Sequence, residues 1–265
     1  MKKTSLLISF LVIAAVCNSQ GLIDGFFKGQ NHGTVAVSAS YQSSTQYWAG
    51  DSLINFNRNQ PNAGLFGTYG IIDGLDVVAS IPFVNLAPQD ASLFAKWRAF
   101  QRTSERGGKF TLGIAAGMSV PMSNYNTESS TAIGQRATIV EPRVFLQYHF
   151  PNRFFIQAQA GYTYAFDPVP SGIPASIKLG YTHDKWYADV WFDLRDSETG
   201  KDYTGTGDRK PNSFRELEVD YQRIGATFYK PFSDKFGLSL GLDHTLSGRN
   251  MFKSTGVNLG FIRNF

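Results

Sequence analysis

Two residues in the C-terminal part of the chain have side chains that could act together in catalysis. His244 and Ser247 are the base and nucleophile types of a serine hydrolase, and they are three positions apart. The surrounding residues alternate between apolar and polar or small side chains, as in a β-strand. Because neighbouring side chains of a strand point to opposite faces, this odd spacing separates the two groups. The sequence therefore predicts no catalytic residue and no enzyme.

Candidate ligands for metals and phosphate are scattered along the chain. The other histidines, His32, His149 and His183, are isolated and form no zinc pattern. The acidic residues of 196–213 lack the spacing of a calcium loop. The Gly-Thr-Gly of 205–207 has no buried strand before it and no helix after it, as a phosphate-binding loop requires. We expect neither a metal nor a cofactor.

A larger polar set occupies alternate positions of segments whose other face is apolar. In residues 110–120, for example, Phe110, Leu112 and Ile114 alternate with Thr111 and Gly113. Two interpretations stay open for the charged members: they pair across neighbouring strands and brace the fold, or they line a pore or ligand path. Their mixed sign argues against strong ion selectivity. The polar residues expected to line an interior are Lys96, Arg98, Arg143, Gln147, His149, Gln157, Gln159, Lys178, Asp189, Asp193 and Asp243.

The elements that would position these residues are about twelve strands of period two. Short turns and longer connections alternate between them, with long connections predicted at 47–61, 122–136, 167–173 and 197–213. An even strand number with this asymmetry is typical of outer-membrane barrels, which have short periplasmic turns and longer extracellular loops. The predicted strands are 33–46, 62–72, 75–85, 92–103, 109–121, 137–149, 153–166, 174–183, 186–196, 214–230, 235–247 and 253–265.

The first residues have the layout of a signal peptide. Lys2 and Lys3 precede an apolar run over 5–17, which is shorter than the ~20 residues of a spanning helix. We expect a signal peptide over 1–19, cleaved after Ser19, and one barrel domain over 20–265. The alternative is lipidation of Cys17, although Val16 before it is branched where a small residue is expected. Since Cys17 is the only cysteine, the mature chain has no disulfide.

The composition excludes several other classes of protein. No stretch after residue 20 is apolar over the length of a spanning helix, and a net charge of +4 suggests no nucleic-acid partner. The 22 Phe, 12 Tyr, 4 Trp and 26 Gly fit strands with tight turns and aromatic belts at a membrane surface. The belt aromatics are expected at Tyr148, Phe150, Phe154, Phe155, Phe228, Tyr229, Phe232 and Phe236 on one side, and at Tyr41, Tyr47, Trp48, Phe83, Tyr162, Tyr164 and Phe166 on the other.

The pattern predicts an all-β, closed, antiparallel transmembrane barrel with its apolar face outward. In lipid, no water satisfies the backbone, so spanning strands must close into a ring without a free edge. A ring of twelve strands with its apolar side chains inward would enclose a large apolar void, because about eight strands already fill their interior. Outer-membrane lipid is therefore an expected partner, and the outer membrane is the expected location.

Several passages resemble a known family. The stretches GTYGIIDGLDVVASIPF (67–83) and KPFSDKFGLSLGLD (230–243), with the corner SGRN (247–250), are similar to the outer-membrane transporter family named for the meta-cleavage pathway of phenol degradation, in its Bacteroidetes members. The last strand, ending on Phe265, resembles the signature by which the barrel-assembly machinery recognises its substrates, although Arg263 replaces the usual aromatic. The resemblance implies a transporter or channel for small, hydrophobic or aromatic, compounds and carries over no ligand residues.

Three hypotheses follow for the function. The first is passage of a small molecule through, or into, the barrel. The second is a structural or surface protein whose lumen is closed by its own side chains and loops. The third is a lipid-modifying hydrolase, since the outer-membrane phospholipase and lipid A deacylase are barrels with a histidine-activated serine. The passage around His244 departs from the His-x-Ser-Asn pattern of the phospholipase.

Overall fold

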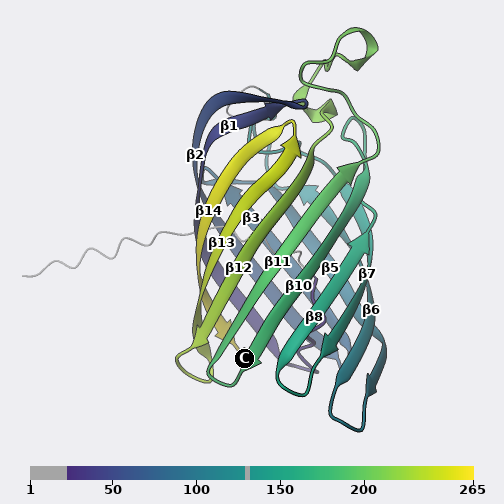
Figure 1. Ribbon diagram of the computed structural model, residues 1–265, viewed down its shortest axis with the longest axis vertical. Coiled ribbons are helices and arrows are strands. Elements are labelled where there is room, and N and C mark those ends of the chain that lie inside the picture. The colour runs from purple at the N-terminus through teal and green to yellow at the C-terminus, as the bar shows by residue number, and fades with distance from the viewer. Residues whose placement is uncertain (1–22, 129–131) are drawn as a thin grey trace, which may run out of the picture.

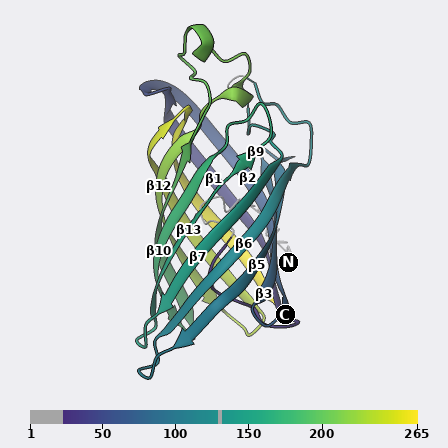
Figure 2. The ribbon, with the colours of Figure 1, turned by 90° about the vertical axis from the view of Figure 1, so that its right-hand side faces the viewer.

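The alternating segments form long strands whose backbones pair with both neighbours, and together they close into a barrel (Figures 1 and 2). The computed structural model describes residues 23–128 and 132–265. Over these residues it has twelve long strands, two strands of two residues each, β4 (Ala87–Pro88) and β9 (Tyr164–Ala165), and the 3-10 helices η1 (Gly207–Arg209) and η2 (Phe214–Glu216). The long strands are β1 (Gly33–Ala49), β2 (Ser52–Ile72), β3 (Leu75–Val84), β5 (Asp90–Thr103), β6 (Lys109–Pro121), β7 (Ile139–His149), β8 (Phe154–Gly161), β10 (Gly172–His183), β11 (Trp186–Ser197), β12 (Asp220–Pro231), β13 (Phe236–Arg249) and β14 (Met251–Asn264).

The first and last strands close the ring. β1 pairs antiparallel with β2 on one side and with β14 on the other. From β14 the antiparallel order runs back through β13 and β12 to β3, which pairs with β2. No long strand therefore has a free edge, and the prediction of a closed antiparallel barrel is confirmed. Closure satisfies the backbone hydrogen bonds that lipid cannot satisfy.

The two faces of the wall differ in polarity as the alternation predicts. On β14, Val257, Leu259 and Phe261 point outward and are 44%, 50% and 46% exposed, whereas Asn258 between them is buried. The same contrast recurs around the ring, which leaves large apolar side chains on the outside and polar ones inside. A continuous apolar surface of this kind is unfavourable in water and matches the hydrocarbon of a bilayer.

The barrel has two unlike ends. The turn end has five short connections between consecutive strands and the C-terminus, and the loop end has the long connections 122–138 and 198–219 (Figure 1).

Two boundaries of the strands differ from the sequence-based prediction. The long loop predicted at 47–61 is wrong, because β1 and β2 continue as a hairpin to a tight turn at Gly50 and Asp51, and polar residues such as Asn55 and Asn57 disguised the strand pattern. The strand predicted from 214 begins at 220, after η2.

The predicted signal peptide, residues 1–19, lies outside the described residues. None of the helices within 23–128 and 132–265 is long and apolar enough to cross a membrane.

Candidate functional site

The segment that precedes β1, residues 23–31, packs against the inner face of the wall. Ile23 is 1% exposed and packs in a cluster with Val78, Phe94, Ala115 and Phe145, which come from β3, β5, β6 and β7. These four side chains lie on the inner face of their strands, so the cluster is an apolar core within an otherwise polar interior. The N-terminal segment therefore occupies the lumen beside these strands.

Polar contacts fasten this N-terminal segment to the wall. The Lys96 ammonium lies 2.8 Å from Asp24 Oδ1 and also donates to the carbonyl oxygens of Asp24 and Phe26. The Gly25 amide donates to Gln147 Oε1 at 3.1 Å. Gln157 and Gln159 on β8 both donate to the Ile23 carbonyl, at 3.3 and 3.1 Å. Backbone groups that no strand could pair are thereby satisfied inside the barrel.

A buried ion pair supports the same contact. Asp76 on β3 and Lys96 on β5 are direct neighbours in register, and their charged atoms lie 3.5 Å apart with side-chain exposures of 0% and 3%. Asp76 also accepts from the Lys28 amide at 3.1 Å. Removal of one partner from a buried pair costs about 3–5 kcal/mol, because the other charge is left uncompensated. The N-terminal segment thus rests on a site that tolerates little change.

Aromatic rings complete the packing around the segment. The Phe26 ring meets His149, Phe155 and Tyr187 edge to face, with centroids 5.2, 5.2 and 6.1 Å away. Phe155 is 1% exposed, so its assignment to a lipid-facing belt is wrong. It follows Phe154 directly, and alternation along β8 turns the two rings to opposite faces. Side chains from both the segment and the wall therefore occupy this part of the lumen.

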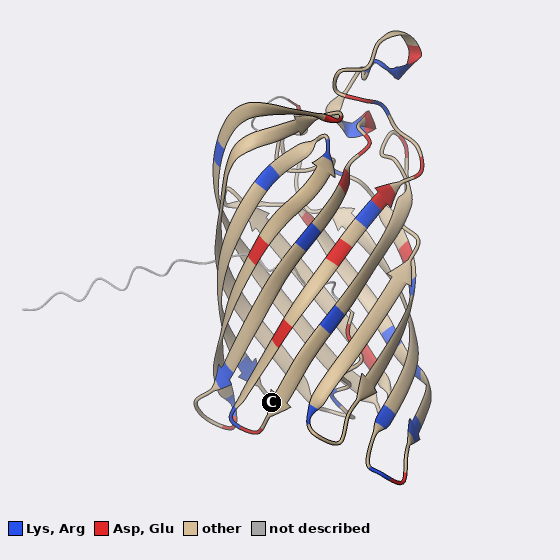
Figure 3. Ribbon diagram, viewed as in Figure 1, with Lys and Arg blue, Asp and Glu red and all other residues tan. Residues whose placement is uncertain are grey.

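Of the residues expected to line an interior, one group meets the N-terminal segment and most of the others form ion pairs along the wall. Lys178 lies 3.3 Å from Asp189, and Asp193 lies 2.7 Å from Arg223. The neighbouring strands β10 to β12 carry these charges (Figure 3). Arg143 contacts Glu141 (2.6 Å) and Gln159 (3.0 Å), and Asp243 lies against Gly256. Arg98 pairs with Asp73 (2.8 Å) and also lies over the ring of Phe27 in the N-terminal segment. The residues that contact this segment are Lys96, Arg98, Gln147, His149, Gln157 and Gln159.

Two cavities lie toward the loop end. The smaller, of about 290 Å³, has a mixed lining in which Ser92, Arg143, Asp193 and Arg223 lie beside apolar residues such as Phe66. The larger, of about 590 Å³, also reaches Arg223 and is called the vestibule below. It is lined by aromatic and apolar side chains with few charges, among them Tyr47, Ile54, Phe56, Arg58, Tyr203, Phe214, Leu217, Arg223, Met251 and Phe252. Tyr47 therefore lines the vestibule, although the sequence placed it in a belt.

Aromatic contacts organise the vestibule wall. Tyr47 from β1, Phe56 from β2 and Phe252 from β14 form a cluster, with the Tyr47 and Phe252 centroids 4.9 Å apart and those of Phe56 and Phe252 5.6 Å apart. Tyr203 joins Tyr47 at 6.0 Å and Phe214 at 5.6 Å. The connection 198–219 thus supplies part of the wall, and its position decides the shape of the vestibule.

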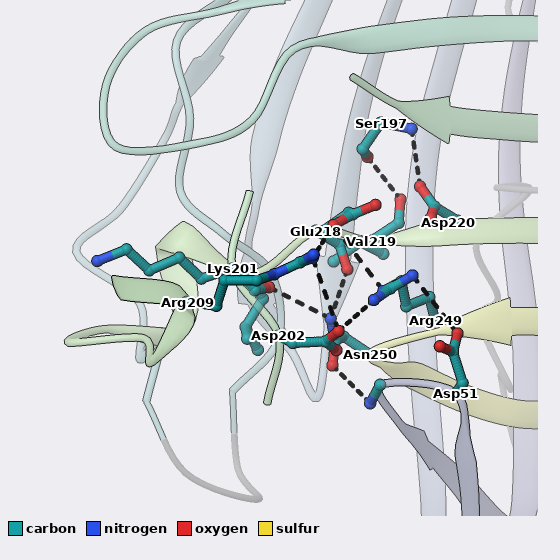
Figure 4. Close-up of polar contacts among 12 residues, drawn as sticks. Asp51, Ser197, Lys201, Asp202, Arg209, Glu218, Val219, Asp220, Arg249 and Asn250 are labelled. Atoms are coloured by element: carbon teal, nitrogen blue, oxygen red, sulfur yellow. Dashed lines mark hydrogen bonds and ion pairs between the residues drawn. The ribbon is translucent and has the colours of Figure 1, made fainter. Parts of the chain in front are cut away.

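A polar network holds that connection against the strand tips (Figure 4). Asn250 accepts hydrogen bonds from the amides of Gly50 (2.9 Å) and Tyr203 (3.1 Å) and donates to the Glu218 carbonyl (2.7 Å). Arg249 forms an ion pair with Asp202 and lies 3.8 Å from Glu218. We call these contacts the loop clamp. It joins the β1–β2 tip and the β13–β14 turn to the longest loop.

The residues considered for catalysis are placed apart from this arrangement. His244 Nδ1 lies 2.8 Å from Thr255 Oγ1 on β14. A β-bulge between Thr245 and Ser247 shifts the register on β13, so that His244 pairs with Ile224 and Ser247 with Gln222, both of which face outward. The expectation that His244 and Ser247 lie on opposite faces is therefore wrong, because the bulge interrupts the alternation between them. Within 23–128 and 132–265, no three His, Cys, Asp or Glu side chains come together as metal ligands would.

Sequence reasoning missed several residues of the interior. Asp76 alternates with apolar Leu75 and Val77, so the strand pattern could have placed it inside. Arg223 follows the same rule on β12, but its strand was predicted to begin too early. Asp24 and Arg58 gave no such signal, because one precedes the first strand and the other lies in the stretch interpreted as a loop.

Comparisons with known proteins agree with this architecture. The most similar structures include an outer membrane channel from Pseudomonas putida F1, at 15% identity and a TM-score of 0.71, covering 92% of this chain and all of the other. The NanC porin follows at 10% identity and a TM-score of 0.57, covering 86% and 98%, and the KdgM porin at 8% and 0.50, covering 86% and 99%. At these identities the likeness concerns the fold.

No curated protein matches the sequence significantly. Residues 63–261 match the family described as "Putative MetA-pathway of phenol degradation". This stretch covers most of the chain and includes all long strands except β1 and the ends of β2 and β14. The chain therefore belongs to that family, as the resemblance of its strand motifs suggested.

Proposed function

We propose that this barrel admits small, partly apolar molecules at its loop end and passes them across the outer membrane. The observation that carries the proposal is the vestibule, a cavity of about 590 Å³ with an aromatic wall at the mouth of a barrel whose outer surface is apolar. Cavities of this size and character are typical of sites for small organic molecules.

The comparisons support the same function. The similar structures are named as a channel and as porins, and the family description refers to phenol degradation. The turn end would face the periplasm, where the assembly machinery would engage β14 through Phe265. Both the channel name and the vestibule favour transport over catalysis.

Recordings from single proteins in planar bilayers test the proposal. Purified protein should carry a small ionic current, because the N-terminal segment fills part of the lumen, and a phenyl solute such as 4-phenyl-1-butanol should reduce that current. A Phe252→Ala variant should require a higher solute concentration, since it removes a central ring of the vestibule wall.

The second candidate, an envelope protein that does not conduct, is favoured by the segment packed in the lumen. A variant with residues 23–28 replaced by Gly and Ser separates the two. If neither this variant nor the natural chain conducts, the transport proposal is refuted and the structural role is supported.

A further inference from the structure

The vestibule contains a cation that is held in position without a carboxylate partner. Arg58 on β2 faces inward between Phe56 and Gln60, which also line the vestibule. Its Nη2 donates to the Ala132 carbonyl at 2.7 Å, and its guanidinium lies 4.6 Å from the centroid of the Phe252 ring. These two contacts orient the group, but neither neutralises its charge.

No acidic side chain within the described residues lies at ion-pair distance from Arg58 or lines the vestibule. The remaining residues, 1–22 and 129–131, contain no Asp or Glu in the sequence. Acids on the loops of this end are engaged elsewhere. Asp202 and Glu218 pair with Arg249 and Arg209 in the loop clamp, and Glu128 accepts hydrogen bonds from Ser213 and the Phe214 amide. The chain therefore has no counter-charge of its own for Arg58 in this cavity.

Arg223, the other arginine that lines the vestibule, has a carboxylate partner, unlike Arg58. Arg223 Nε and Nη2 donate to the two carboxylate oxygens of Asp193, at 3.2 and 2.7 Å. A guanidinium presents five donors in a planar fork, a geometry that matches a carboxylate in two parallel hydrogen bonds. Arg58 has the same fork and uses one nitrogen for Ala132.

We propose that the vestibule binds amphipathic carboxylates, with the acid group on Arg58 and an apolar body against the aromatic wall. Tyr47, Phe56 and Phe252 lie next to the cation, and Tyr203 and Phe214 offer further ring surface beyond them. A partly desolvated cation is unfavourable without a partner, and a ligand carboxylate relieves that cost. A ligand amine would meet repulsion at the same place. This inference rests on the proposed function and names the class of molecule that the vestibule selects.

Three probes with one apolar body test the head-group preference. 4-Phenylbutyrate, 4-phenyl-1-butanol and 4-phenylbutylamine differ in charge alone to a first approximation, and calorimetry with the full protein in lipid nanodiscs at pH 7.5 measures their affinities. The acid is ionised at this pH. Since a charge-assisted hydrogen bond adds about ten-fold or more to affinity, we expect the acid to bind at least ten-fold more tightly than the alcohol, and the amine most weakly.

Substitutions of Arg58 test whether this residue causes the preference for the carboxylate probe. Arg58→Gln should bring the acid and the alcohol to similar affinities and should relieve the penalty on the amine. Arg58→Lys keeps the charge but loses the planar fork of donors. The order of the three affinities should therefore persist, but 4-phenylbutyrate should bind less tightly than to the natural chain. Arg102→Gln, at an exposed position near the turn end, is the matched control and should behave as the natural chain.

The outcomes separate this inference from the proposed function. Equal affinity of acid and alcohol in the natural chain overturns the carboxylate preference and leaves passage of apolar molecules intact. An acid preference that survives Arg58→Gln also overturns it. If none of the probes binds, the vestibule is not a ligand site, and only the current measurements above bear on transport.

Discussion

Lys96 contacts both the N-terminal segment and the buried Asp76 of the wall, so we expect the docking of the segment to depend on it. Lys96→Met keeps the length of the side chain but removes its contacts to Asp24 and to the Phe26 carbonyl, and it leaves Asp76, which is fully buried, without its cation. Hydrogen bonds to charged groups contribute about 1.5–3 kcal/mol each. A loss of about 3 kcal/mol from the docking of the segment raises the undocked fraction by roughly 150-fold.

The expected result is a barrel that conducts more and is less stable. The mean single-channel conductance in planar bilayers should rise in Lys96→Met relative to the natural chain. Lys185→Met, at an exposed turn between β10 and β11, is the matched control and should change neither quantity.

A double variant separates the stability of the wall from the docking of the segment. Asp76→Leu in addition to Lys96→Met removes the uncompensated charge, so unfolding stability in urea should recover in part. The conductance should stay high, because the contacts to Asp24 and Phe26 remain absent. A Lys96→Met protein that folds and conducts like Lys185→Met would refute the reasoning, since the segment would then not depend on this cation.

Four further predictions concern the loops, the lipid face and the last strand. Asn250→Ala removes the four hydrogen bonds that this side chain makes in the loop clamp, so the connection 198–219 should be cut several-fold faster by protease in the folded protein. Hydrogen bonds from Ser213 and the Phe214 amide lower the pKa of Glu128 below the ordinary value of 4.5. This contact between loops should be fully present above pH 4.5 and should weaken as the pH falls through the lowered pKa, which hydrogen exchange over a descending pH series, corrected for the intrinsic exchange rate, would reveal. Leu242→Arg, on the outward face, should lower the free energy of unfolding by about 2–4 kcal/mol, measured by urea unfolding of the protein in vesicles. Deletion of Phe265 should reduce the amount of folded, heat-modifiable barrel in outer membranes.

The strand pattern was sufficient for the wall and for the direction of most side chains. Along β14, the alternation of Val257, Asn258 and Leu259 contains the same information as the structure, because burial on one face repeats every second residue. The alternation does not predict which residues of neighbouring strands lie opposite each other. Asp193 and Arg223 meet because β11 and β12 pair in the register that sets these two residues opposite each other, and no local pattern encodes that alignment.

The alternation of apolar and polar residues could not predict that residues 23–31 and Arg58 lie inside the barrel. Residues 23–31 have neither a helical nor a strand period, and they gain their order only from a wall that closes around them. Gly25 and Gln147 are 122 positions apart and meet only after seven strands are in place. Arg58 was hidden differently, because the upper part of β2 carries polar side chains on both faces and so has no apolar period.

The mouth and the deeper part of the lumen differ in whether their arginines have carboxylate partners, and they would therefore bind a charged ligand differently. At the mouth, the charge of Arg58 has no carboxylate partner, whereas the charges of Arg143 and Arg223 deeper inside are neutralised by Glu141 and Asp193. An amphipathic anion would therefore bind more tightly in the vestibule than in the smaller cavity below it, and selection would take place at entry. Passage of such a ligand would then require the segment at Lys96 to move, since its side chains occupy part of the lumen, from β3 to β11. Under the proposed function, affinity is thus set at the loop end and rate at the turn end, and substitutions at Arg58 and Lys96 should affect the two quantities separately.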